Sequence, residues 1–336
     1  MKGSWKGAIN AGKIWRTSAK KLKEFPPLPD QPLLIGTRGS PLALWQARHV
    51  WARLLEAAHL GEGAVGLSVI TTSGDRIKDK PLRDFGGKGL FTKEIDEALL
   101  RGDVDMAVHS MKDLETDLPA GLCIAAILPR GDVRDAFIST KARLLAELAP
   151  GSVVGTSSLR RQAQILRLRP DLRVVNFRGN VETRLNKLAE GQADATLLAL
   201  AGLERLGLAS HATSILSTEE MLPAVAQGAI GVTCRSDDAR TRALLRPLDD
   251  TASAATVACE RAYLARLDGS CKTPIAGLAE IGRGVLRFRG LILVPDGSEW
   301  YDIEVTGAAE NAPSIGADAG EALRTRAGPE FIAKLA

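Results

Sequence analysis

Short apolar segments with the pattern of β-strands alternate with amphipathic helices along most of the chain, and this alternation limits the fold more than any other feature. Residues 33–35 and 67–70 are predicted strands, and a helix with one apolar face lies between them. The pattern continues in residues 103–108, and after residue 130 in residues 135–139 and 152–154. Strands that alternate with helices form a parallel sheet covered on both faces. The sequence therefore predicts an α/β protein.

Two parts of the chain resemble each other. IGTRGSPLAL from Ile35 and VGTSSLRRQA from Val154 both contain a strand, Gly-Thr, a turn and the start of a helix. GDVDMAVHSMKDL from Gly102 and GQADATLLALAGL from Gly191 share a Gly, an Asp three residues later, an apolar strand and a closing Leu. Chance similarity between strand–helix units is the alternative explanation. We expect two related α/β lobes that face each other across a cleft.

The chain divides into an arm and three domains. Residues 1–31 form a basic arm, with seven Lys or Arg and no acid among the first 23 residues, and we expect it to be disordered. No apolar stretch follows these charges, which argues against a secretory signal and leaves an organelle transit peptide as the alternative. We assign residues 32–129 and 223–246 to the first α/β domain and 130–222 to the second. Residues 250–336 form a small α+β domain, in which a helix precedes antiparallel strands.

Composition excludes several classes of protein. The net charge is only +4 and aromatic residues make up 4% of the chain, so the basic segments lack the interleaved aromatics typical of nucleic-acid binding. No apolar run approaches the length of a membrane span. The four cysteines, none of them in a C-x-x-C motif, fit neither a zinc site nor a disulfide scaffold. We therefore expect reduced thiols in a cytoplasmic protein, with no metal, nucleic acid or membrane partner.

Polar residues follow the predicted strand 103–108. Lys112 and Asp113 come just after it, and ligands bind at the carboxyl ends of strands in an open α/β sheet. Because the two side chains are adjacent and opposite in sign, a solvated surface ion pair is the alternative interpretation. Arg38 leaves the matching strand end earlier in the first lobe.

Arginines gather at the strand ends of the second lobe. Arg160 and Arg161 fall in the first turn of a helix that Ser158 caps, where the helix dipole disfavours positive charge. Together with free backbone N–H groups and neighbouring hydroxyls they form an anion site. Arg178 and Arg184 bracket the start of the next helix. This concentration of arginines predicts a ligand with several carboxylates or phosphates.

Six motifs together resemble the porphobilinogen deaminase family, also called hydroxymethylbilane synthases. In chain order they are TRGSPLALWQ, GGKGLFTKE, HSMKDL, GTSSLRRQ, RGNVETR and LDGSCKTP, and the resemblance covers about residues 33–280. It implies two lobes like those of bilobal binding proteins and a third domain. It also implies a cytoplasmic, monomeric transferase of tetrapyrrole biosynthesis. Such enzymes join four porphobilinogens head to tail, with loss of ammonia, to give hydroxymethylbilane. The implied cofactor is one covalent dipyrromethane per chain.

The resemblance also assigns roles by motif position. Cys271 would hold the cofactor through a thioether. Asp113 would be the catalytic carboxylate, with Lys112 and Arg38 beside it, because an anion stabilises the positive charge that spreads onto a pyrrole when ammonia leaves. The other cofactor-binding residues would be Ser110, Lys112, Asp113, Thr156, Ser158, Arg160, Arg161 and Arg184. The substrate-binding residues would be Arg38, Ser40, Lys88, Ser157, Arg178, Gly179 and Arg184.

The strongest alternative is a non-catalytic bilobal protein that binds a small anion. It explains the two lobes and the arginines. It does not explain a third domain that presents Cys271 in a turn of small and polar residues. A covalent adduct on the chain would separate the two hypotheses.

Overall fold

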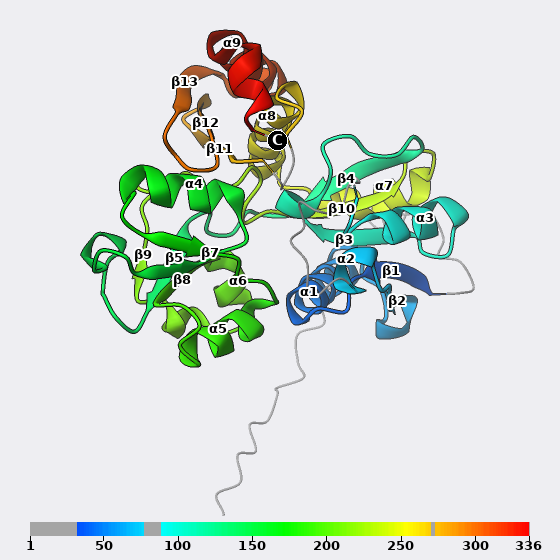
Figure 1. The fold of residues 1–336 in the computed structure, drawn as a ribbon. Coiled ribbons are helices and arrows are strands. Elements are labelled where there is room, and N and C mark those ends of the chain that lie inside the picture. Colours follow the sequence, from blue (N-terminus) through cyan, green and yellow to red (C-terminus); the bar gives the residue numbers. More distant parts are fainter. Residues whose placement is uncertain (1–31, 77–88, 270–272, 336) are drawn as a thin grey trace, which may run out of the picture.

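Two five-stranded sheets with the same topology form the two lobes (Figure 1). The computed structural model describes residues 32–76, 89–269 and 273–335. The first sheet contains β1 (Leu33–Thr37), β2 (Val65–Val69), β3 (Met106–Ser110), β4 (Leu122–Ile127) and β10 (Ile230–Arg235). The second contains β5 (Asp135–Ser139), β6 (Val153–Gly155), β7 (Arg173–Val175), β8 (Ala195–Ala199) and β9 (Ser214–Ile215).

The strand orders confirm the internal repeat predicted from the sequence. They are β2-β1-β3-β10-β4 and β7-β6-β8-β5-β9, so β1 and β6 take the same place in their sheets, as do β3 and β8. The first pair of similar motifs includes β1 and β6, and the second pair includes β3 and β8. The polar residues that follow these strands therefore lie at equivalent ends of the two sheets.

Each sheet is mixed, and the prediction of a wholly parallel sheet is wrong. β1 pairs in parallel with β2 and β3, and β6 with β7 and β8. β10 runs antiparallel to β3 and β4, and β5 antiparallel to β8 and β9. β5 and β10 are the strands by which the chain enters one lobe from the other, so they come from the opposite direction.

Helices cover both faces of each sheet. In the first lobe, α1 (Pro41–Ala57) and α7 (Ala239–Leu245) pack on one face and α3 (Lys93–Arg101) on the other, while α2 (Ser73–Arg76) follows β2. In the second lobe, α4 (Leu159–Leu168) packs on one face, and α5 (Val181–Ala189) and α6 (Leu200–Arg205) on the other. The predicted start of α1 is confirmed, because the Ser40 hydroxyl accepts a hydrogen bond from the Ala43 N–H and Pro41 is the first helical residue.

The third unit has the predicted α+β composition. β11 (Ile275–Gly282), β12 (Val285–Leu293) and β13 (Trp300–Ala308) form an antiparallel sheet, and α8 (Thr251–Arg266) and α9 (Ala312–Ala333) pack against it (Figure 1). Short 3-10 turns complete the chain at Glu62–Ala64, Met111–Asp113, Leu145–Glu147, Ala209–His211, Arg246–Leu248 and Ala309–Asn311. Within the three described ranges, no helix is long and apolar enough to cross a membrane.

A buried carboxylate ties the three units together. Glu260 on α8 is fully buried and pairs with Arg130, with 2.7 Å between Oε1 and Nη1. It also accepts hydrogen bonds from the backbone N–H groups of Ala226 and Ala279. Arg130 and Ala226 lie in the two segments that connect the lobes, and Ala279 lies in β11. The third unit therefore packs where the chain crosses between the lobes.

Candidate active site

A pocket lies at the carboxyl ends of β1 and β3 in the first lobe. Arg38 and Ser40 follow β1, Ser110 ends β3, and Asp113 ends the 3-10 turn after it; all four line the pocket. The structure thus brings together predicted site residues from two segments that are about 70 residues apart in the sequence. β3 runs to Ser110, further than the predicted strand 103–108, so His109 lies in the sheet, where its Nε2 is 2.9 Å from the Thr233 hydroxyl.

Asp113 and Arg38 share this pocket but are not paired. Asp113 is half-buried and accepts no hydrogen bond from any residue in the described ranges. Arg38 is held by Asp75, with 2.5 Å between Nη2 and Oδ1, and its guanidinium lies 4.2 Å from the centre of the Phe91 ring. Burial raises the pKa of Asp75, but the hydrogen bonds and charge of Arg38 outweigh it, so the net pKa is lowered. Asp113 therefore keeps its carboxylate available at the mouth of the pocket.

The pKa values of Lys112 and Arg184 respond to charged groups of both lobes. Burial lowers the pKa of Lys112 to about 8, and the charges of Asp113, Arg161 and Asp135 all act on it. Burial likewise lowers the pKa of Arg184 to about 10, with Arg161 lowering it further and Asp113 raising it. Lys112 belongs to the first lobe and Arg184 to the second, and charges from both lobes act on each of them.

The hydroxyls after β6 shape the start of α4. Ser158 accepts a hydrogen bond from the Arg161 N–H at 3.4 Å, which confirms it as the cap. The Thr156 hydroxyl accepts from the Ser158 N–H, and the Ser157 hydroxyl donates to the Asn176 side chain at 2.6 Å. The Thr156 and Ser158 hydroxyls act as acceptors in these contacts, so each keeps its own O–H group as a donor.

The loop after β7 carries the remaining predicted residues of this lobe. The Gly179 carbonyl accepts a hydrogen bond from Arg184 Nε at 2.8 Å, and the Arg178 carbonyl accepts one from Lys187. Arg184 is thereby fixed to the start of its own helix, and the Asp113 charge raises the pKa of its guanidinium group.

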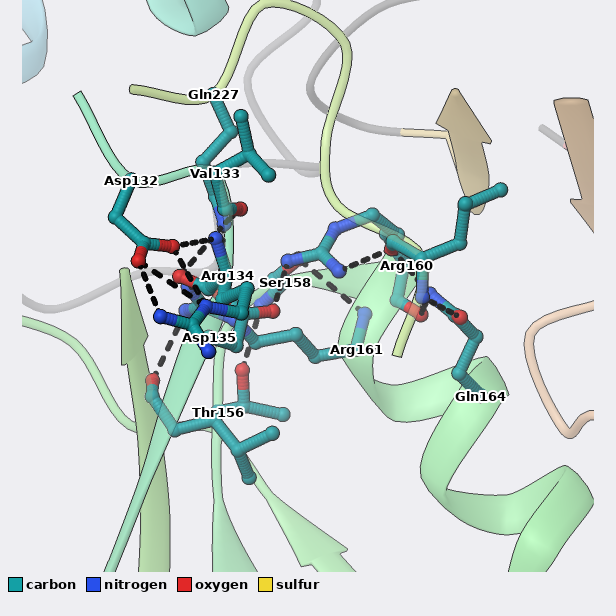
Figure 2. A network of polar contacts seen from close by, with 12 residues as sticks. Asp132, Val133, Arg134, Asp135, Thr156, Ser158, Arg160, Arg161, Gln164 and Gln227 are labelled. Atoms are coloured by element: carbon teal, nitrogen blue, oxygen red, sulfur yellow. Dashed lines mark hydrogen bonds and ion pairs between the residues drawn. The ribbon is translucent and has the colours of Figure 1, made fainter. Parts of the chain in front are cut away.

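Arg160 and Arg161, the arginines of the predicted anion site, are buried in the second lobe. Only 4% and 5% of their surfaces are exposed, and both pair with the fully buried Asp135, at 2.7 and 2.8 Å (Figure 2). The Leu222 and Leu197 carbonyls accept further hydrogen bonds from them. Asp135 explains how two arginines are tolerated against the dipole of α4. Arg160 Nε is nevertheless buried without a partner in the described ranges.

Sequence reasoning missed Asp135 and two buried glutamines. Gln46 on α1 exchanges hydrogen bonds with the Ser110 hydroxyl, at 2.8 and 3.1 Å, and lines the pocket. Gln227, between the lobes, donates to Asp135 Oδ1 at 2.8 Å. The available signal for Asp135 was an acid at the head of the apolar strand DAFIS. The glutamines stand singly among apolar neighbours, which is a weaker signal.

The described residues fit a ligand with several carboxylates. Lys112 and Arg184 are cations whose pKa values are lowered mainly by burial, so a nearby ligand carboxylate would stabilise their charges. In the described residues, Arg160 Nε is a buried donor without an acceptor. A dipyrromethane that carries acetate and propionate groups supplies such acceptors. Lys88 and Cys271, the other two predicted contacts, lie outside the described residues.

Comparisons with known proteins agree with this chemistry. The family model "Porphobilinogen deaminase, dipyromethane cofactor binding domain" matches residues 33–243, and "Porphobilinogen deaminase, C-terminal domain" matches residues 254–325. A porphobilinogen deaminase of Nitrobacter hamburgensis is 55% identical over 89% of this chain and 94% of its own. A chloroplastic porphobilinogen deaminase of Oryza sativa is 57% identical over 90% of this chain and 86% of its own. A solved methionine-binding protein, MetQ, is 14% identical over 64% of this chain and 89% of its own, with a TM-score of 0.42, too low to support any statement on function. The matches to family and relatives cover most of the sequence, and the chain belongs to the porphobilinogen deaminase family.

Proposed function

We propose that Asp113 is the catalytic carboxylate of this enzyme and that Lys112 and Arg184 bind carboxylates of its pyrrole ligands. The chain carries out the reaction of its family, the head-to-tail condensation of four porphobilinogens with loss of ammonia to give hydroxymethylbilane. Each porphobilinogen has an acetate and a propionate group, so the growing product is a polyanion. A cleft lined by cations suits it.

The observation that carries the proposal is the unpaired carboxylate of Asp113 among cations. Asp113 accepts no hydrogen bond from the described residues, although Lys112 and Arg184 both respond to its charge. When ammonia leaves porphobilinogen, positive charge spreads onto the pyrrole nitrogen. A fixed carboxylate that faces this N–H group stabilises the charge where it develops, and it can also accept the proton.

We propose Cys271 as the attachment site of the dipyrromethane, which supplies the pyrrole carbon from which the product chain is built. Cys271 lies in the motif LDGSCKTP beside Lys272, and a nearby cation favours the thiolate. By contrast, burial raises the pKa of Cys234 and of Cys259 to about 12. Those two thiols stay protonated at neutral pH and are poor nucleophiles.

The assignment of Asp113 is tested by Asp113→Asn. We expect a folded protein whose kcat falls by about a thousandfold or more, because a developing charge loses its partner. KM should change only a few-fold, since the carboxylate acts mainly in the transition state. The matched control is Asp103→Asn, an exposed carboxylate at the other end of β3 that pairs with Arg101. A near-normal kcat in folded Asp113→Asn would return Asp113 to the role of a surface charge.

The enzyme acts, we further propose, as a monomer in the cytoplasm. Cys123, Cys234 and Cys259 are free thiols in the described ranges, as expected in a reducing compartment. Light scattering on the purified full chain tests the first point. Fluorescence of a fusion to its C-terminus tests the second, and an organellar signal would favour a targeting role for the basic arm.

A further inference from the structure

Asp135 lies at the centre of a fully buried cluster in the second lobe, and we propose that it is the positioning residue for the anion-binding arginines of this enzyme. Its Oδ2 accepts hydrogen bonds from Arg160 Nη2 at 2.7 Å and Arg161 Nε at 3.3 Å (Figure 2). Its Oδ1 accepts from Arg161 Nη2 and Gln227 Nε2, both at 2.8 Å. Four donors thus converge on one carboxylate. The proposal rests on the proposed function and on the cofactor-binding role that the family resemblance predicts for Arg160 and Arg161.

The cluster is not electrically balanced. Two guanidinium groups face one carboxylate, so one unit of positive charge remains in a buried place. Burial raises the pKa of Asp135, but Arg160 and Arg161 outweigh this and lower it overall, so the group is ionised at neutral pH. The pKa of Lys112 responds to all three charges, so Lys112 adds a third cation to the two arginines. An unpaired charge in a protein interior is costly, and a ligand carboxylate removes that cost.

Some N–H groups of Arg160 and Arg161 are not used in hydrogen bonds to the described residues, which is consistent with a ligand that accepts from them. Arg160 uses Nη2 on Asp135 and Nη1 on the Leu222 carbonyl, and its Nε has no partner among the described residues. Arg161 uses Nε and Nη2 on Asp135 and Nη1 on the Leu197 carbonyl. Each guanidinium has five N–H donors, so each keeps some for a further acceptor. A purely structural ion pair would instead use its donors within the protein.

Gln227, in a segment that connects the lobes, and Gln164, on α4, fix the same cluster. The Gln227 side chain also donates to the Val133 carbonyl, and the backbone carbonyl of Gln227 accepts a hydrogen bond from Arg130 Nε. Gln164 donates to the Leu222 carbonyl, the acceptor that holds Arg160, and accepts from the Leu222 N–H. The arginines are therefore held in one orientation by both connecting segments, and Asp135 is the only anion among these contacts.

The test compares Asp135→Asn with Asp132→Asn. Asp132 is a matched control, because it lies three residues earlier, pairs with Arg134 at 2.6 Å, and has no hydrogen bond or ion pair with Arg160 or Arg161 in the described part of the chain. In Asp135→Asn we expect KM for porphobilinogen to rise about tenfold or more, and the fraction of purified chain that carries the covalent cofactor to fall, while kcat of the loaded fraction changes much less. Asp132→Asn should leave all three quantities within about twofold of wild type.

A second variant covers the case in which Asp135→Asn does not fold. Asp135→Glu keeps the charge but displaces the carboxylate by one methylene, so we expect a folded protein with an intermediate rise in KM. Wild-type KM and cofactor content in either folded variant would overturn the proposal. Arg161→Gln separates this failure from that of the proposed function. If it lowers cofactor content while Asp135 variants do not, the arginines bind the ligand without needing Asp135. If it has no effect either, their proposed role in binding fails as well.

Discussion

The pKa of Lys112 makes a prediction at the scale of single residues. Burial lowers it to about 8, whereas Arg184 titrates at about 10. Lys112 is protonated at neutral pH and loses its charge as the pH rises through about 8. Its attraction for ligand carboxylates is therefore weaker above that pH. We expect KM for porphobilinogen to rise between neutral pH and about pH 9. In Lys112→Arg this rise should disappear, because an arginine keeps its charge. A flat KM profile in the wild type would contradict the assignment.

Asp96 carries a second pH effect, on stability. It is almost fully buried on α3, and burial raises its pKa to about 6, with the Thr92 hydrogen bond lowering it and Glu115 raising it. The folded state therefore binds a proton more tightly than the unfolded chain. Its stabilising contribution is complete below the ordinary value of 3.8 and is lost as the pH rises through about 6.

Replacing Asp96 by the isosteric neutral Asn removes this effect. At pH 8 we expect Asp96→Asn to raise the free energy of unfolding by about 2 kcal/mol, and at pH 5 by clearly less. Urea unfolding at the two pH values measures both changes. Asp103→Asn, at an exposed carboxylate that pairs with Arg101, is the control and should change neither. An equal gain at both pH values would show that the carboxyl group is not the cause.

Single residues also show the limit of reading a site from sequence. The strand-end rule found Arg38 and Asp113, which share one pocket because the ends of neighbouring parallel strands meet at one edge. Ser40 and Ser110, which line the same pocket, were predicted only through the family resemblance. The strand-end rule did not find Asp135, since a buried partner is set by the packing of β5 against α4 and leaves no local pattern. The same packing explains why Arg160 and Arg161 are buried.

At the scale of elements, the turn between β12 and β13 packs against α4, the helix of the two buried arginines. Gly297 in this turn has φ of +74°, and a Cβ there would lie 2.5 Å from the Ala163 carbonyl oxygen and the Arg167 nitrogen. Pro295, nearby, accepts a hydrogen bond from Gln162 at 3.2 Å. The third unit therefore packs against the second lobe through this turn.

Gly284 provides a control for Gly297 with almost the same backbone conformation. Its φ is +78°, and a Cβ there would meet nothing within 4 Å. Both Gly→Ala variants carry the cost of a left-handed conformation, about 1–2 kcal/mol. Gly297→Ala should lose about 1–3 kcal/mol more, because the added methyl overlaps the backbone of α4. Chemical denaturation of the two variants measures the difference. Equal losses would mean that the turn and α4 are not tightly packed.

Local signals predicted most elements. Ser40 with Pro41, and Ser158, mark the helix starts that the structure has, since capping depends on residues close in sequence. Strand direction was not predictable in this way. β5 and β10 run antiparallel to their neighbours because the chain crosses between lobes, which is a property of the whole topology.

At the scale of the whole molecule, the repeat gives the two lobes equivalent binding edges. The ends of β1 and β3 carry Arg38 and Asp113, and the end of β6 carries Ser158 ahead of Arg161. Sequence alone suggested this through two pairs of similar motifs, and the equal strand orders confirm it. The structure adds what the motifs do not show: the pKa values of Lys112 and Arg184, from different lobes, both respond to the charges of Asp113 and Arg161.

The intact mass of the purified chain tests the central claim most directly. We predict that active wild-type protein is heavier than its sequence by two porphobilinogen units less the two ammonia molecules released on attachment. Peptide mapping should find this addition on Cys271, and Cys271→Ser should fold, have the mass of its sequence and be largely inactive. Active wild-type protein with the unmodified sequence mass, or the addition on Cys259, would contradict the account.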